Sequence, residues 1–326
     1  MPSVTPGLVA TLAIAYAALL IGSGIRLLFF RFVRDRDNQR LALGRRNSLF
    51  VWWVLLIAFS LALIFGSPGL AAFFCIASLL GLREFFRIFE QRSPTVPALR
   101  LLLPAVAVVH YSLIFLSAQE WTFWTFPIAV LVLVTGVEVT TSGSRDFLRT
   151  AAGCYWAAML IIFGLSHAVM LVGLPAAPGA ASPGSIGWCL FVVLLTEVND
   201  IAQALIGRSL GKHKVTPGLS PGKTQEGCLG GFTVTTCLAM CAAPWLTTLT
   251  IDRPVWLGLL ISAGAGLTIA VAGFLGDLNM SALKREAGVK DSGTLLPGMG
   301  GMIDRIDSLT LAAPAFYYYA LSINHL

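Results

Sequence analysis

Residues 151–173 read AAGCYWAAMLIIFGLSHAVMLVG, and no Asp, Glu, Lys or Arg interrupts them. A helix that crosses the hydrocarbon core of a bilayer needs about 20 apolar residues. The run meets that length and predicts a transmembrane helix. The rest of the chain has the same character, since 56% of its residues are hydrophobic and only 12% are charged. Soluble domains carry about 25% charged residues, so lipid is the expected solvent for most of this chain.

Nine further apolar runs are candidate spans, and several of them are short or contain Gly and Pro. We therefore expect an all-α polytopic membrane protein, a bundle of about eight to ten transmembrane helices. The run at 69–82 is the weakest and could be re-entrant. The remaining candidates are residues 7–30, 50–66, 101–116, 121–136, 187–206, 227–249, 255–276 and 308–323.

The basic residues test this layout independently, because Lys and Arg concentrate in cytoplasmic loops. If ten spans alternate, all of the 22 Lys and Arg residues except Arg253 fall on one side of the membrane. That side is predicted to be the cytoplasm, with both termini on the other side. The net charge of +6 is then mostly a topological signal. Nucleic-acid binding is not expected, because the chain offers no basic soluble module.

The inner loop at 207–231 combines Gly, Pro, Lys and small polar residues, including SPGKT at 220–224. Small residues beside a lysine let backbone N–H groups and an ammonium approach a phosphate. The loop is not a Walker A motif, because Pro217 stands where that spacing requires Gly. Upstream, Glu197 and Asp200 lie three residues apart on one helix face, near the inner end of a span. Ionisable residues in a membrane are costly and usually functional.

The second inner loop, at 276–307, is denser in charge. Its charged positions include Asp277, Asp291, Asp304 and Asp307 beside Lys284, Arg285, Lys290 and Arg305. Mg²⁺ is typically bound by one or two carboxylates together with substrate phosphates, and Lys and Arg can hold the remaining phosphate charge. Pro297 and the glycines after it allow a sharp bend between the two halves of the loop. The sequence therefore predicts a site for phosphate and for Mg²⁺ or another hard divalent cation.

Residues 281–307 follow the pattern Ser-x2-Lys-Arg-x4-Lys-Asp-x-Gly-x2-Leu-Pro-Gly-x-Gly-Gly-x2-Asp-Arg-x-Asp. This pattern resembles the signature of the CDP-diacylglycerol synthases, also called phosphatidate cytidylyltransferases, and the loop at 207–231 resembles the upstream loop of the same family. The resemblance covers about 200–307, and the first 180 residues share only general apolar spans. It implies transfer of the cytidylyl group of CTP to phosphatidic acid, which gives CDP-diacylglycerol and pyrophosphate in phospholipid biosynthesis.

The resemblance also implies roles for single residues. Asp277, Asp304 and Asp200 match metal-binding or acidic positions. The nucleotide and phosphate positions are Ser220, Lys223, Thr224, Glu226 and Lys290. The catalytic positions are Lys284, Arg285, Asp291, Arg305 and Asp307. Residues 1–180 are then N-terminal transmembrane helices, and residues 181–326 form a C-terminal transmembrane catalytic region with both motif loops.

Two positions depart from the family's pattern. Met299 stands where His is usual, and an imidazole there could carry a proton, whereas a thioether could not. The simpler interpretation is that the position shapes a turn, because the reaction needs no essential proton carrier. The second departure is NDIAQ at 199–203, which resembles a bacterial side branch of the family and bears on the preferred lipid more than on the chemistry.

Three single residues in the spans are assigned no part in the reaction. Trp52 and Trp53 lie near a span end, where interfacial aromatic residues are common. His110 is expected to pack or to hydrogen-bond between helices.

Two alternatives stay open. The first keeps CTP but uses another lipid phosphate as acceptor, such as a polyprenyl phosphate. The second is a transporter of phosphorylated metabolites, which broken spans and buried carboxylates suit, although the charges cluster in loops. The leading hypothesis places a multi-pass protein among the lipids of the bacterial inner (cytoplasmic) membrane, with its active site facing the cytoplasm. A homodimer is plausible from the many small residues on helix faces.

Overall fold

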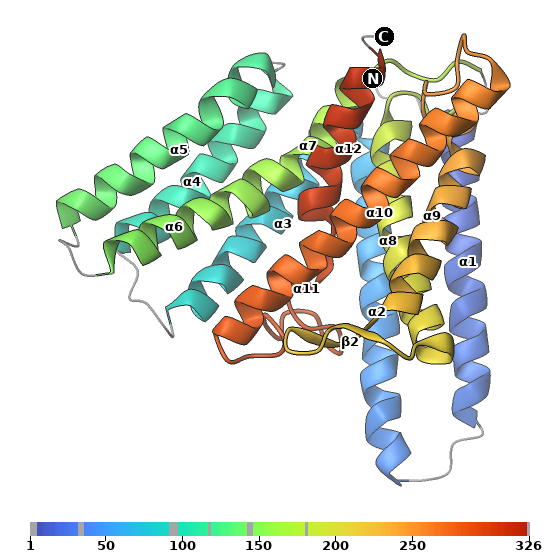
Figure 1. Ribbon diagram of the computed structural model, residues 1–326, viewed down its shortest axis with the longest axis horizontal. Helices are drawn as coiled ribbons and strands as arrows, with labels where there is room; N and C mark the ends of the chain where they lie inside the picture. The colour runs from blue at the N-terminus through green and yellow to red at the C-terminus, as the bar shows by residue number, and fades with distance from the viewer. Residues whose placement is uncertain are drawn as a thin grey trace.

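The computed structural model is a bundle of helices with one small hairpin at one end (Figure 1). It describes residues 5–31, 36–90, 97–116, 119–141, 146–179 and 182–324, and side-chain environments are described outside 25–47, 119–123 and 324. The all-α, polytopic class is confirmed. Among the described residues, eight helices are long and apolar enough to cross a membrane. A shorter apolar segment, Ser48–Ile64, and the last helix complete the bundle.

The first half of the chain contains seven α-helices and two irregular helical segments. The α-helices are α1 (Pro6–Arg31), α2 (Arg36–Ile64), α3 (Gly66–Phe89), α4 (Pro97–Phe115), α5 (Gln119–Thr141), α6 (Phe147–Ala157) and α7 (Leu165–Met170). The run at 151–173 is helical throughout, as predicted. It widens into a π-helical segment, η1 (Ala158–Gly164), between α6 and α7, and it ends in a 3₁₀ turn, Leu171–Gly173.

The second half carries the motif loops. Its elements are α8 (Ile186–Leu210), β1 (Lys214–Thr216), β2 (Ser220–Thr224), α9 (Gln225–Leu246), α10 (Val255–Glu286), α11 (Ile303–Ile306) and α12 (Leu309–Asn324). The two strands form an antiparallel hairpin in which Lys214 pairs with Thr224 and Thr216 with Ser220. The sequence patterns did not predict this hairpin.

Two of the predicted boundaries that differ from the structure bear on the site, and both were wrong because a helix continues past its apolar run. The weak candidate at 69–82 is the middle of α3, a 24-residue helix that includes Arg83 and Glu84 rather than ending before them. The candidate at 255–276 is the start of α10, a 32-residue helix that runs on to Glu286. Asp277 and Lys284 therefore lie on a rigid helix and not in a loop.

Helix α12 lies in the interior and packs against α7 and η1 as well as α8 and α10. Small residues permit close approach of helix backbones. A Cβ placed on Gly164 would overlap the carbonyl oxygen of Thr310, and one on Gly187 would overlap that of Leu246. The division of the chain at residue 180 stays a prediction. Helix α12 contacts helices that precede residue 180 in the sequence as well as helices that follow it.

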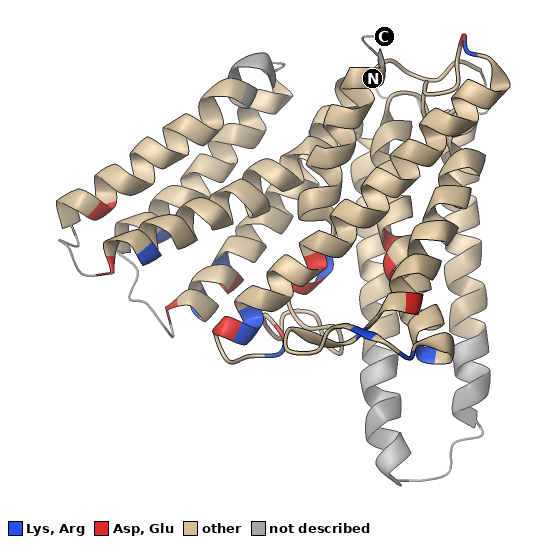
Figure 2. Ribbon diagram, in the orientation of Figure 1, with Lys and Arg blue, Asp and Glu red and all other residues tan. Residues whose placement is uncertain are grey.

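The charged residues are distributed unevenly along the bundle (Figure 2). Where side chains are described, they gather toward the end that holds the hairpin and α11, apart from the turn between α9 and α10 with Asp252 and Arg253. Helix α1 begins and α12 ends at the end opposite the hairpin (Figure 1). This agrees with the predicted placement of both termini on one side. The side chains of the basic segment at 31–46 lie outside the described residues.

Candidate active site

The hairpin is anchored to α9 by two of the predicted phosphate-loop residues. Thr224 is the N-cap of α9, and its hydroxyl accepts a hydrogen bond from the backbone N–H of Gly227 at 3.1 Å. The Glu226 carboxylate accepts from the backbone N–H of Lys212 at 3.0 Å and lies 2.6 Å from Nδ1 of His213. Capping of this kind stabilises helix starts. Thr224 and Glu226 therefore position the loop through contacts with its own backbone.

Lys223, at the end of β2, connects the hairpin to the two long helices beside it. Its ammonium lies 2.6 Å from the Asp277 carboxylate of α10 and donates to the side-chain oxygen of Gln203 of α8 at 3.1 Å. It also lies 5.5 Å from the ring centroid of Phe274. Burial acts to lower the pKa of Lys223, but the Asp277 and Asp200 carboxylates outweigh it, so the pKa is raised. Lys223 is thus a firmly charged cation.

Besides Asp277, the carboxylates of Asp200 on α8 and of Asp307 between α11 and α12 surround this lysine. Asp200 of α8 accepts from the hydroxyl of Ser308 at 2.7 Å, while its other oxygen is buried without a hydrogen-bond partner among the described residues. Asp307 accepts from the backbone N–H of Ser308 at 2.8 Å. Burial, followed by repulsion from Asp277 and Asp200, raises the pKa of Asp307 well above its ordinary value. Asp277, Asp200 and Asp307 also each act to raise the pKa of Lys223, so all three carboxylates belong to the surroundings of this lysine.

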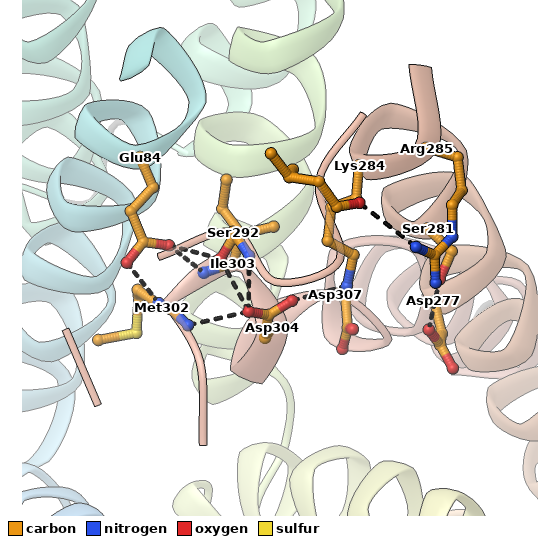
Figure 3. Close-up of polar contacts among 12 residues, drawn as sticks. Glu84, Asp277, Ser281, Lys284, Arg285, Ser292, Met302, Ile303, Asp304 and Asp307 are labelled. Carbon is orange, nitrogen blue, oxygen red and sulfur yellow. Dashed lines mark hydrogen bonds and ion pairs between the residues drawn. The ribbon is translucent and has the colours of Figure 1, made fainter. Parts of the chain in front are cut away.

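A second cluster surrounds Asp304 (Figure 3). One carboxylate oxygen lies 2.6 Å from the Lys284 ammonium, and the other accepts from the backbone N–H groups of Ser292 at 2.9 Å and Gly301 at 2.8 Å. Burial acts to raise the pKa of Asp304, but Lys284 and the Gly301 and Ser292 backbone donors lower it overall. Both oxygens of Asp304 accept from protein donors, and these contacts hold the loop on α10.

Glu84 of α3 completes this cluster and was missed in the sequence patterns. It is 7% exposed. Its carboxylate accepts from the backbone N–H groups of Met302 at 2.8 Å and Ile303 at 3.0 Å, and from the Ser292 hydroxyl at 2.8 Å (Figure 3). A Cβ on Gly301 would overlap the Glu84 carboxylate, which accounts for glycine there. The only signal in the sequence is an acidic residue beside Arg83 at the end of an apolar run.

Met299 sits in a tight turn that the backbone itself defines. Its N–H donates to the carbonyl of Leu296 at 2.9 Å, and Leu296 N–H donates to the carbonyl of Gly300 at 2.9 Å. Gly298 and Gly300 have φ values of 76° and 87°, a region that favours glycine. The turn requires no hydrogen bond from the side chain at 299. This geometry favours the interpretation that the position shapes a turn.

The remaining predicted residues surround these clusters. The Arg285 side chain donates to the carbonyl of Leu219 at 3.0 Å and so ties α10 to the hairpin. Arg305 is partly buried, and its Nε lacks a hydrogen-bond partner among the described residues. Lys290 and Asp291 are exposed on the loop after α10. Ser220 is partly exposed at the start of β2.

Two pockets open beside the clusters. The smaller, about 270 Å³, is lined by residues of α8, β2 and α9 that include Asp200, Gln203, Arg208 and Lys223. The larger, about 620 Å³, lies between α2 and the loop after α10, and Asp291, Met299 and Arg305 line it. The larger pocket lies within the range of about 300–1,000 Å³ that is typical of ligand sites, and the smaller lies just below it. The cationic side chains thus face spaces that suit small anionic ligands.

The predicted metal ligands divide between the two clusters. Asp200 and Asp277 lie with Asp307, whereas Asp304 is bonded to Lys284, Ser292 and Gly301. No group of three or more His, Cys, Asp or Glu side chains in the described part of the chain is arranged to hold a metal ion. Mg²⁺, however, usually takes only one or two carboxylates plus substrate phosphates. The unpartnered oxygen of Asp200 beside Asp277 fits that requirement.

A known protein family covers most of this chain. Residues 46–323 match the family model described as the cytidylyltransferase family. This chain belongs to the cytidylyltransferase family. It is therefore an enzyme of the nucleotidyltransferase class, in agreement with the function expected from the two motif loops. The matched region includes α3 with Glu84, so the family extends over the first half of the chain, where the motifs gave no information.

Two relatives cover most of this cytidylyltransferase chain, and a third covers a part of it. YnbB of Escherichia coli (strain K12), described as an uncharacterized protein, is 36% identical over 95% of this chain and 97% of its own length. A phosphatidate cytidylyltransferase of Synechocystis sp. (strain ATCC 27184 / PCC 6803 / Kazusa) is 30% identical over 81% of this chain and 92% of its own. A phosphatidate cytidylyltransferase of Haemophilus influenzae (strain ATCC 51907 / DSM 11121 / KW20 / Rd) is 44% identical over 40% of this chain and 44% of its own.

Proposed function

We propose that this protein transfers the cytidylyl group of CTP to phosphatidic acid, forming CDP-diacylglycerol and pyrophosphate. The observation that carries the proposal is the meeting of Lys223, Asp277 and Asp200 from three elements beside a pocket at the charged end of a membrane bundle. Cations and carboxylates at a membrane surface suit a reaction between an anionic lipid and an anionic nucleotide. The names of the Synechocystis and Haemophilus relatives support the same substrates.

In the proposed reaction, an oxygen of the phosphatidate phosphate attacks the α-phosphorus of CTP. A new P–O bond forms there, the bond from the α-phosphorus to the β-phosphate oxygen breaks, and pyrophosphate leaves. Such transfers depend mainly on positioning and on neutralising charge. Lys223 and Arg305 supply positive charge at the two pockets, and no side chain needs to act as nucleophile, because the lipid phosphate is one.

Mg²⁺, or another hard divalent cation, would be held by Asp277 and Asp200 together with substrate phosphates. When bound, it would draw charge from the phosphate oxygens and orient them. Asp307 belongs to the same group of carboxylates, and its raised pKa reflects its burial beside Asp277 and Asp200. Asp304 is assigned to positioning, since its oxygens already accept hydrogen bonds from Ser292, Gly301 and Lys284.

The proposed location is the bacterial inner membrane, with the hairpin and α11 facing the cytoplasm. The excess of Lys and Arg at that end supports this orientation, because basic residues concentrate on the cytoplasmic side. CTP would then arrive from the cytosol, and the lipid from the adjacent leaflet. A homodimer remains a prediction from the small residues on helix faces.

The test uses purified protein in detergent with labelled CTP and Mg²⁺, and it offers phosphatidic acid and a polyprenyl phosphate in separate reactions. The proposal expects a labelled lipid from phosphatidic acid and far less of it from the Asp277→Asn variant at the same Mg²⁺ concentration. Label in the polyprenyl product alone would select the alternative acceptor. No labelled lipid from either acceptor, with the protein shown to be folded, would overturn the proposal.

A further inference from the structure

The larger pocket brings a helix of the first half of the chain to the second motif loop. Its walls are Ser48 and Trp52 of α2 on one side and the loop from Asp291 to Gly300 with Arg305 on the other. Its volume of about 620 Å³ lies within the range of small-molecule sites. No residue of α2 was assigned a role from the sequence. The roles assigned to the motif loops therefore do not explain why α2 forms one wall of this pocket.

The two adjacent tryptophans of α2 have different surroundings. Trp53 contacts α1, because its indole N–H donates to the Ser23 hydroxyl at 3.3 Å and its ring lies 6.0 Å from that of Tyr16. Trp52 is partly buried and lines the pocket instead. Trp53 therefore serves helix packing, whereas Trp52 offers an aromatic surface to whatever occupies the pocket.

The polar groups of the pocket narrow the chemistry of its occupant. Asp291 presents an exposed carboxylate that has no ion pair among the described residues. Arg305 lines the same pocket, and its buried Nε lacks a hydrogen-bond partner in the described part of the chain. An aromatic surface, a hydrogen-bond acceptor and a guanidinium together suit a flat ring with an amino group that is joined to a phosphate.

A nucleoside phosphate fits this combination better than a lipid headgroup does. Aromatic side chains stack on nucleic-acid bases, and a carboxylate can accept a hydrogen bond from the exocyclic N4 amine of cytosine. The carboxylate of Asp291 would repel the phosphate of a lipid headgroup at the same point. The smaller pocket, lined by Arg208 and Lys223, offers cations for that phosphate.

We propose that the larger pocket binds the nucleoside of CTP, with Trp52 stacking on the cytosine ring and Asp291 accepting a hydrogen bond from its N4 amine. The inference rests on the proposed function and adds a nucleoside-binding role for Trp52, which lies outside both motif loops, and a specificity role for Asp291. Uracil has a carbonyl oxygen in place of that amine, so Asp291 would also select against UTP. Arg305 would lie toward the phosphates.

The first experiment measures equilibrium binding of CTP and UTP to the purified protein in detergent, without lipid, so that turnover is not needed. Trp52→Leu should weaken CTP binding by about 10-fold or more, the order expected for one stacked base, and Trp52→Phe should restore most of it. Trp53→Leu is the matched control and should leave CTP affinity unchanged. Equal CTP affinity in Trp52→Leu and the unmodified protein would overturn the proposal.

The second experiment tests base selection. Asp291→Asn should lower the preference for CTP over UTP by about 10-fold, because an amide can donate to the uracil carbonyl. An unchanged preference would remove the role assigned to Asp291.

In turnover assays, Trp52→Leu should raise KM for CTP and leave KM for phosphatidic acid unchanged, and a rise in the lipid KM alone would assign the pocket to the lipid. If the unmodified protein neither binds CTP nor turns over, the proposed function itself is contradicted. If the unmodified protein turns over normally and the Trp52 and Asp291 variants bind CTP and UTP as it does, only this inference is contradicted.

Discussion

Glu84 and Ser292 are separated by 208 positions in the chain and are joined by a hydrogen bond of 2.8 Å. The backbone N–H of Ser292 donates to Asp304 at 2.9 Å, and Asp304 pairs with Lys284 of α10. A chain of polar contacts therefore runs from α3 across the second motif loop to α10 (Figure 3). Buried polar networks of this kind are costly when they are only partly satisfied, so each member should be sensitive to substitution.

Glu84→Gln tests the α3 end of this network. Met302 and Ile303 donate to different oxygens of Glu84, so the amide nitrogen of Gln would face one of these N–H groups and leave that buried donor without an acceptor. The free energy of unfolding should fall by about 1–3 kcal/mol, and turnover should fall with it. Denaturant titration in mixed micelles and the cytidylyl-transfer assay measure the two effects.

Glu90→Gln is the matched control at the end of the same helix. Glu90 pairs with Arg100 at 3.0 Å, but the Arg100 side chain is 54% exposed. Exposed ion pairs contribute only about 0–1 kcal/mol, so stability and turnover should change little. Equal effects of the two substitutions would show that Glu84 has no special part in holding the loop.

Asp304→Asn separates a positioning role from a metal-binding role. Asp304 and Lys284 form a buried pair, with side chains 9% and 11% exposed. Removing one partner of such a pair costs about 3–5 kcal/mol, so stability should fall together with turnover. The double variant Asp304→Asn with Lys284→Gln should recover stability and not turnover. Full stability of the single variant with lost turnover would instead favour Asp304 as a metal ligand.

Asp277→Asn tests the proposed ligand that lies beside Lys223. Loss of the carboxylate should raise the Mg²⁺ concentration needed for half-maximal turnover by at least about 10-fold, since even outer contacts of metal sites cost 10- to 100-fold. A Mg²⁺ titration of initial rates measures this. His110→Ala is the control, because His110 bonds to Ser166 at 2.9 Å in a different part of the bundle, and its turnover per folded molecule should persist. An unchanged Mg²⁺ requirement in Asp277→Asn would exclude that residue as a ligand.

Met299→His introduces the residue that is usual at this position in the signature that the second motif loop resembles. The turn is made by backbone bonds and by Gly298 and Gly300, so kcat should change by less than about 10-fold, below the 10²-fold or more expected of acid–base catalysis. Measurement of kcat at saturating CTP and lipid decides the point. A gain of 10²-fold would show that an imidazole takes part in the chemistry.

The membrane class and the gathering of the motif residues were accessible from sequence, because apolar length and motif spacing are local properties. The extent of α3 and α10 was not. Hydropathy marks where lipid contact ends, and both helices continue past that point because their charged side chains find partners on other elements. Lys284 meets Asp304, and Glu84 meets the start of α11.

The roles within the site were predictable only in part. The motif gives Asp304 and Asp277 the same role, but their partners in the structure differ. Asp304 contacts Lys284 and backbone N–H donors, whereas Asp277 contacts Lys223. Such contacts depend on which elements the fold brings together over long sequence separations. For the same reason, no local pattern pointed to Glu84 or to the contribution of Trp52.

The most direct measurement follows the two ends of the CTP triphosphate separately. Purified protein, Mg²⁺ and phosphatidic acid are incubated with CTP labelled at the α-phosphate in one reaction and at the γ-phosphate in another. The predicted result is α-label in the organic-extractable lipid and γ-label in water-soluble pyrophosphate. Label from the γ-phosphate in the lipid, or no label in the lipid from either substrate, would contradict cytidylyl transfer to phosphatidic acid.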